Sequence, residues 1–90
     1  MFYVYLMKSD KGRWYIGSTK DLRRRIDEHR SGKNFSTKYS RNWKLMYYEA
    51  YINELYARDR EKKLKSFGSA FGHLLKRTGL KRRGEEKTLR

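Results

Sequence analysis

Three short runs of apolar and aromatic residues predict the strands of a small β-sheet. Residues 2–7 and 14–17 are rich in aromatic and β-branched side chains, and the polar segment 8–12 between them ends in a glycine. This pattern is typical of a β-hairpin. Residues 45–51 form a third run of the same kind and predict a third strand.

The hairpin places several tyrosines in a defined way. Side chains alternate between the two faces of a strand, so Tyr3 and Tyr5 share one face. By the same rule, Tyr15 and Gly17 share one face of the second strand. A suitable register between the strands would bring Tyr5 and Tyr15 together on a common face.

A helix is predicted over residues 20–30, because its inward positions recur every three or four residues. These positions are Leu22, Ile26 and His29. Ser18, with Asp21 three residues later, has the spacing of a capping box and predicts that Ser18 caps this helix. Gly32 follows the helix where a C-terminal glycine is common.

A second helix is predicted over residues 54–67, with Asn53 as its N-cap. Its inward stripe consists of Ala57, Glu61, Leu64 and Gly68. The carboxylate of Glu61 stands out, because burying an unpaired charge is costly. Residues 70–78 predict a further short helix, and the basic segment 33–44 predicts a loop or a short helix.

Together these elements predict one small α/β domain with a three-stranded mixed or antiparallel sheet flanked by helices. We expect residues 1–78 to form this domain and residues 79–90 to form a mobile basic tail. The chain shows no internal repeat and no second domain.

Charge points to a polyanionic partner. The 90 residues contain 24 Lys and Arg against 10 Asp and Glu, for a net charge of +14. Such a surplus favours nucleic acid, and less strongly an anionic membrane face, over a merely solubilising surface. The arginine-rich start of the first helix, directly after Gly17, is also a natural phosphate site, because helix N-termini favour anions.

Composition excludes several kinds of site. The chain has no cysteine and two histidines, so it offers no disulfide, no thiolate zinc site and no histidine cluster. Any metal would be held by carboxylates and water. No signal peptide precedes the first strand and no apolar run approaches the roughly 20 residues that span a bilayer, so we expect a cytoplasmic protein.

Taken in order, these elements resemble the GIY-YIG nuclease superfamily over roughly residues 2–66. Tyr15-Ile16-Gly17 matches the second motif outright, and Tyr3-Val4-Tyr5 stands where Gly-Ile-Tyr is expected, with the first glycine replaced. Leu22-x-x-Arg25-Ile26-x-x-His29 resembles the family's helix, and Ala57-x-x-x-Glu61-x-x-Leu64-Lys65 its metal-binding segment. Lys38-Tyr39-Ser40-Arg41 is similar to the Lys-Tyr-Thr-Arg loop of the small single-domain members.

The resemblance implies a metal-dependent endonuclease that hydrolyses phosphodiester bonds in DNA, with a role in DNA repair. Tyr5 and Tyr15 would lie near the attacking water, one of them acting as general base. Arg25 would hold the scissile phosphate, a task that suits a bidentate guanidinium. Glu61 would bind a divalent cation, Mg²⁺ or Mn²⁺, and His29 would assist proton transfer or orient a neighbour.

Further residues would contact the nucleic acid outside the reacting centre. The resemblance and the charge pattern assign this role to Gly17, Arg23, Arg24, Lys38 and Arg41.

Simpler interpretations of the same residues stay open. Tyr15 and His29 can be packing residues, Arg25 a surface arginine, and Glu61 the partner of Arg58 or Lys65 at helical spacing. The chain as a whole could then be a non-catalytic nucleic-acid-binding module that retains the nuclease fold. A ribosome-associated basic protein is a weaker third possibility.

Overall fold

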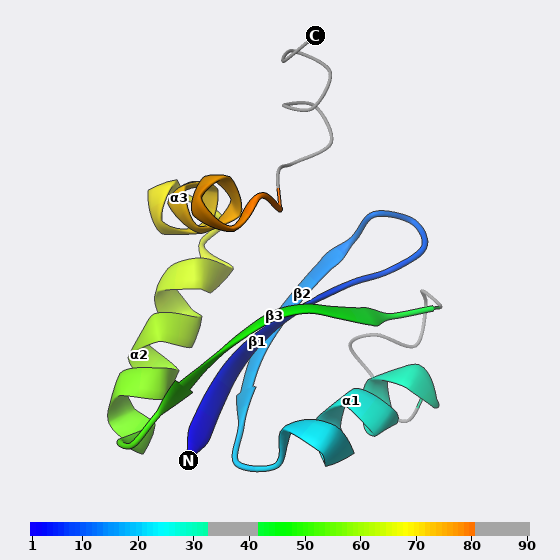
Figure 1. Ribbon diagram of the computed structural model, residues 1–90, viewed down its shortest axis with the longest axis horizontal. Helices are drawn as coiled ribbons and strands as arrows, with labels where there is room; N and C mark the ends of the chain where they lie inside the picture. The colour runs from blue at the N-terminus through cyan, green and yellow to red at the C-terminus, as the bar shows by residue number, and fades with distance from the viewer. Residues whose placement is uncertain (33–41, 81–90) are drawn as a thin grey trace, which may run out of the picture.

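The predicted hairpin forms, and the third strand completes an antiparallel sheet (Figure 1). The computed structural model describes residues 1–32 and 42–80. Its elements are β1 (Phe2–Lys8), β2 (Trp14–Thr19), α1 (Leu22–Arg30), β3 (Lys44–Tyr51), α2 (Glu54–Lys65) and α3 (Ser69–Thr78). The strand order is β2-β1-β3, so β1 is central and both of its neighbours run antiparallel to it.

The hairpin register brings the tyrosines together as predicted. Tyr5 pairs with Gly17 and Met7 pairs with Tyr15, which puts all four on one face of the sheet. The rings of Tyr5 and Tyr15 lie 6.1 Å apart between centroids. β2 is longer than predicted, because it continues beyond Gly17 to Thr19.

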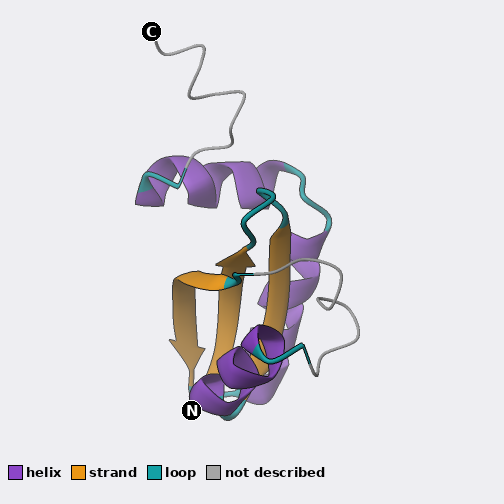
Figure 2. Ribbon diagram, turned by 90° about the vertical axis from the view of Figure 1, so that its right-hand side faces the viewer, coloured by secondary structure: helices purple, strands orange, loops and turns teal. Residues whose placement is uncertain are grey.

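One helix, α2, covers one face of the sheet, and α3 packs against the same apolar layer at one end (Figures 1 and 2). The buried apolar residues between these layers are Val4, Leu6, Ile16, Ala57, Leu64, Phe71, Leu74 and Leu75. Fully burying one such side chain stabilises the fold by roughly 1.5–3 kcal/mol. This layer is the main core of the domain.

The other face is covered only in part, by α1 (Figure 2). A smaller cluster forms here from Tyr5, Met7 and Trp43, with Tyr15, Leu22, Ile26 and Leu45 packed against it. Tyr48 of β3 lies on the same face but is 52% exposed. α1 therefore leaves part of this face open to solvent.

The predicted cap of α1 is wrong, whereas that of α2 is confirmed. The N-cap of α1 is Asp21, whose carboxylate accepts a hydrogen bond from the backbone N–H of Arg24. Ser18 still belongs to β2, and its hydroxyl donates to Glu61 instead. Asn53 caps α2, which ends at Lys65, two residues earlier than expected.

The predicted loop or short helix at 33–44 lies mostly outside the described residues, as does most of the predicted basic tail. Within the described ranges, no helix has the length and apolar character needed to cross a membrane.

Candidate active site

Tyr5 is at the centre of the candidate site and is completely buried. Its hydroxyl oxygen lies 2.9 Å from Nε2 of His29, which is itself buried on the inner side of α1. Arg25 lies near this hydroxyl, and it acts to lower the pKa of Tyr5.

Gly17 makes the position of Tyr5 possible. A Cβ atom on Gly17 would lie 2.6 Å from the Tyr5 hydroxyl oxygen and 2.8 Å from the adjacent ring carbon. Any side chain at this position would displace the Tyr5 hydroxyl. The glycine of the Tyr-Ile-Gly motif thus serves the close approach of a tyrosine ring to the backbone of the neighbouring strand.

The buried pair is neutral near pH 7. Burial, with a smaller contribution from Tyr15, raises the pKa of Tyr5 to about 12, although Arg25 opposes this shift. Burial, together with the nearby charge of Arg25, lowers the pKa of His29 to about 4. A neutral imidazole can accept the Tyr5 proton at Nε2 when its other nitrogen carries the hydrogen.

Tyr15 lies at the border between this buried group and solvent. Its ring centroid is 4.4 Å from that of His29, and the side chain is partly exposed. Tyr5, by contrast, has no exposed surface. Of the two predicted catalytic tyrosines, Tyr15 is therefore the one with access to bulk water.

Glu28 holds Arg25 in place and was not predicted as a site residue. One of its carboxylate oxygens accepts from Nη1 of Arg25 at 2.9 Å, and the other lies 3.3 Å from Nε of Arg24. The three-residue spacing of Arg25 and Glu28 on a helix was the available sequence signal.

Glu61, on α2, contacts β2 from the face of the sheet opposite to Tyr5. Ser18, which follows Gly17 in β2, donates its hydroxyl hydrogen to Oε1 of Glu61 at 2.6 Å. Oε2 of Glu61 lies 2.7 Å from the ammonium of Lys65. The charge of Glu61 also makes a small contribution to the raised pKa of Tyr5.

The pairing of Glu61 matches one of the simpler interpretations considered above. Lys65 is its ionic partner, whereas Arg58 pairs with Glu54. The hydrogen bond from Ser18 was not predicted from the sequence, because it depends on the continuation of β2 past Gly17.

The donor set around Glu61 suits a hard divalent cation. Mg²⁺ prefers oxygen ligands and is often held by one or two carboxylates, with water and substrate phosphate completing the shell. Glu61 and the Ser18 hydroxyl offer such oxygens, and the Lys65 side chain beside them is half exposed, so it can move away. Among the described residues, no group of three or more His, Cys, Asp or Glu side chains could enclose a metal ion.

Of the predicted nucleic-acid contacts, Gly17 is buried within this centre, and the others are not part of it. Arg23 and Arg24 are exposed on α1, and Arg24 pairs with Glu28. Lys38 and Arg41 lie outside the described residues.

Comparisons with known proteins agree with this architecture. The family model of the GIY-YIG catalytic domain matches residues 1–72. A UPF0213 protein of Staphylococcus epidermidis is 35% identical over 66 residues, which cover 72% of this chain and 80% of the relative. A UPF0213 protein of Staphylococcus aureus is 33% identical over the same length.

A solved structure of the same group has the same fold. The solution NMR structure of UPF0213 protein BH0048 from Bacillus halodurans aligns with a TM-score of 0.52 at 33% sequence identity, covering 98% of this chain and 94% of that chain. The name UPF0213 specifies no activity or substrate. With the family model matching most of its length, the chain belongs to the GIY-YIG family and carries a catalytic domain of nuclease type.

Proposed function

We propose that this protein is a metal-dependent endonuclease that hydrolyses phosphodiester bonds in DNA. The observation that carries the proposal is the meeting of Tyr5, His29 and Arg25 above Gly17, with Glu61 at the same strand. A packing role alone would not require a guanidinium beside a buried hydroxyl and a carboxylate at the neighbouring residue. The net charge of +14 supports a polyanionic substrate.

In this proposal Arg25 binds the scissile phosphate. Glu28 restrains the guanidinium through a hydrogen bond, and the Tyr5 hydroxyl lies nearby, so the direction of Arg25 is set before substrate binds. A pre-oriented cation stabilises negative charge that develops in the transition state. The buried Tyr5–His29 pair is the support that keeps Arg25 in this orientation.

Tyr15 is the better candidate for contact with the attacking water, because Tyr5 is fully buried. A tyrosine ionises near pH 10 in isolation and acts as a base in its phenolate form. The phenolate oxygen takes a proton from the water, and the resulting hydroxide forms a bond to phosphorus. The bond between phosphorus and the leaving sugar oxygen breaks, and that oxygen takes up a proton from solvent.

Glu61 would hold the divalent cation, with the Ser18 hydroxyl beside it. A bound Mg²⁺ or Mn²⁺ would supply charge neutralisation at the phosphate and the leaving oxygen. Glu61 lies on the other side of the edge strand β2 from Tyr5 and contacts Ser18, the residue after Gly17. This position supports the assignment.

The test compares Arg25→Ala with Arg24→Ala on labelled DNA in the presence of Mn²⁺. Both substitutions remove one positive charge from α1, but Arg25 lies near the Tyr5 hydroxyl whereas Arg24 is exposed. We expect Arg25→Ala to slow cleavage by about 100-fold or more while DNA affinity changes little, as for loss of one transition-state contact. Equal losses of cleavage activity in the two variants would show that both arginines act only as part of a positively charged patch.

A non-catalytic nucleic-acid-binding module is the second candidate. Two observations favour it: Tyr3 replaces the first motif glycine, and Lys65 already occupies one oxygen of Glu61. Salt-sensitive binding to a panel of DNA structures, with no cleavage in Mg²⁺ or Mn²⁺, would establish this function in place of the nuclease.

A further inference from the structure

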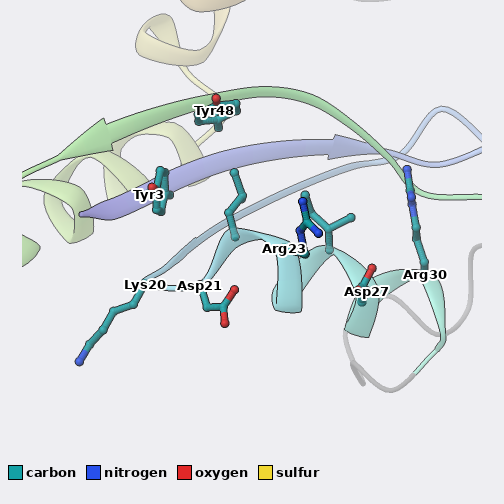
Figure 3. Close-up of a pocket in the computed structure, with 9 residues that line it drawn as sticks. Tyr3, Lys20, Asp21, Arg23, Asp27, Arg30 and Tyr48 are labelled. Carbon is teal, nitrogen blue, oxygen red and sulfur yellow. The ribbon is translucent and has the colours of Figure 1, made fainter.

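An open groove of about 780 Å³ lies beside α1, on the part of the sheet that this helix leaves uncovered (Figure 3). Its floor carries two aromatic rings, Tyr3 from β1 and Tyr48 from β3. Charged side chains of α1 form the other wall, among them Arg23, Asp27 and Arg30. The groove is separate from the buried Tyr5–His29 pair.

The two tyrosines form an aromatic surface that is exposed at Tyr48 and partly buried at Tyr3. Their ring centroids are 6.0 Å apart in an edge-to-face arrangement, and Tyr48 is 52% exposed. Tyr48 also pairs directly with Tyr5 across the β1–β3 ladder. Neighbouring strands are about 4.8 Å apart, so the aromatic surface adjoins the candidate active site.

The cations on the helix side face this surface. Figure 3 shows Arg23 and Arg30 pointing from α1 toward the sheet, whereas Lys20 points away. Arg23 makes no ion pair with any residue in the described part of the chain, and Nε of Arg30 donates to the carbonyl of Trp43 at 3.2 Å. The carboxylate of Asp27 adds a hydrogen-bond acceptor to the same wall.

This combination matches the chemistry of an unpaired nucleotide. A base stacks on an exposed aromatic ring without regard to sequence, because every base has a π face, and its phosphate pairs with a nearby arginine. Paired bases inside a duplex cannot use such a surface, since their faces are covered by neighbouring bases. The carboxylate can accept from the amino group of a base.

We propose that the groove binds an unpaired nucleobase, stacked on Tyr48 with Arg23 on its phosphate. This inference rests on the proposed nuclease function and narrows its substrate class. The nucleic acid would carry an unpaired segment next to the bond that is cut.

The test measures DNA binding by fluorescence anisotropy without divalent metal, so that no cleavage is involved. The probes are a labelled single-stranded deoxyoligonucleotide and its duplex. We expect Tyr48→Ala to weaken single-strand binding by about tenfold, in line with the loss of one stacked base, and to leave duplex binding unchanged. Tyr48→Phe retains the ring and should bind like the parent.

Tyr56→Ala is the matched control, since Tyr56 is 69% exposed on α2 and belongs to no part of the groove. Unchanged single-strand affinity in Tyr48→Ala overturns the proposal, and so does an equal loss on single-stranded and duplex DNA. If Tyr48→Ala loses single-strand binding and the parent cleaves no DNA with Mn²⁺, the groove stands and the nuclease proposal fails. If the parent cleaves DNA but Tyr48→Ala binds both probes normally, the nuclease proposal stands and the groove proposal fails.

Discussion

On one face of the sheet α2 and α3 cover a layer of buried aliphatic and aromatic residues, whereas on the other face α1 encloses hydroxyl, imidazole and guanidinium groups and leaves a groove open. Both faces use the same three strands. The difference comes from the alternation of side chains: Val4 and Leu6 face α2, and Tyr5 faces α1.

The two faces of this small domain differ in role, because one stabilises the fold and the other holds the candidate site. A chain of this size buries only about 60–65% of the surface that it exposes when unfolded, so its stability depends on a dense apolar layer. The α2–α3 face supplies that layer. The α1 face can therefore hold polar groups whose burial is unfavourable, such as neutral His29, without loss of the fold.

The carboxylate of Glu49 has a structural role that contrasts with the role proposed for Glu61. Glu49, on the α2–α3 face, accepts hydrogen bonds from Tyr47 at 2.8 Å, from Tyr51, and from Nη2 of Arg60 at 3.1 Å. Although burial opposes its charge, hydrogen bonds from Arg60 and the two tyrosines hold the pKa of Glu49 below its usual range. This carboxylate is saturated and ties β3 to α2, as expected for a structural group.

The largest expected effect concerns the apolar face. Leu64 is completely buried against the sheet, and we expect Leu64→Ala to lower the free energy of unfolding by about 2–5 kcal/mol through lost burial and the cavity left behind. Urea unfolding measures this change. Leu55→Ala is the control on the same helix: Leu55 is 73% exposed, so its loss should stay within about 0.5 kcal/mol. Similar values for both variants would contradict the assignment of this face as the main core.

The next effect concerns the α1 face and falls mainly on activity. In Gly17→Ala the new methyl group would lie within 3 Å of the Tyr5 hydroxyl and displace it from Arg25 and His29. A misplacement of about 1 Å near a reacting centre costs on the order of 100-fold in rate, so we expect a loss of this size in DNA cleavage.

Gly72→Ala in α3 is the control for Gly17→Ala. Apart from its chain neighbours and the backbone of its own helix, no described atom lies within 4 Å of a Cβ at Gly72. Alanine in a helix is favoured over glycine by about 0.5–1 kcal/mol. This variant should be as active as the parent and slightly more stable. Full activity in Gly17→Ala would show that the close approach of Tyr5 to β2 has no catalytic role.

Local sequence patterns predicted most of the fold. The alternating strands and the stripes of the first two helices contain their own periodicity, and the cap at Asn53 depends on adjacent residues only. The predicted capping box at Ser18 was wrong because it was inferred from local spacing alone. Its three-residue spacing is a local pattern, whereas β2 continues through Ser18 because of pairing with Val4 on β1.

The sequence motifs contain the central residues of the candidate site but not the residues that contact them. Tyr5, Arg25 and Glu61 were found through the motifs that contain them. Glu28 and Ser18 act through contacts that depend on side-chain direction and strand length. The groove was missed because Tyr48 and Arg23 come together only through the order of strands in the sheet and the position of α1 on it.

The smallest expected effect tests the contrast between the two carboxylates. Unlike Glu49, Glu61 has an ionic partner that is half exposed, since Lys65 keeps 51% of its side-chain surface in solvent. Exposed ion pairs contribute about 0.2–1 kcal/mol, so removing the ammonium should make Glu61 only slightly more available to a cation.

We therefore expect Lys65→Ala to lower the Mn²⁺ concentration for half-maximal DNA cleavage by at most about fivefold, the factor that corresponds to 1 kcal/mol. Titration of bound Mn²⁺ by electron paramagnetic resonance should show the same shift. Lys63→Ala is the matched control, because it removes the same charge from the same helix but breaks a pair with Asp59 instead. A weaker Mn²⁺ response in Lys65→Ala than in Lys63→Ala would contradict a metal site at Glu61, because a cation that binds there competes with Lys65 for the same oxygen.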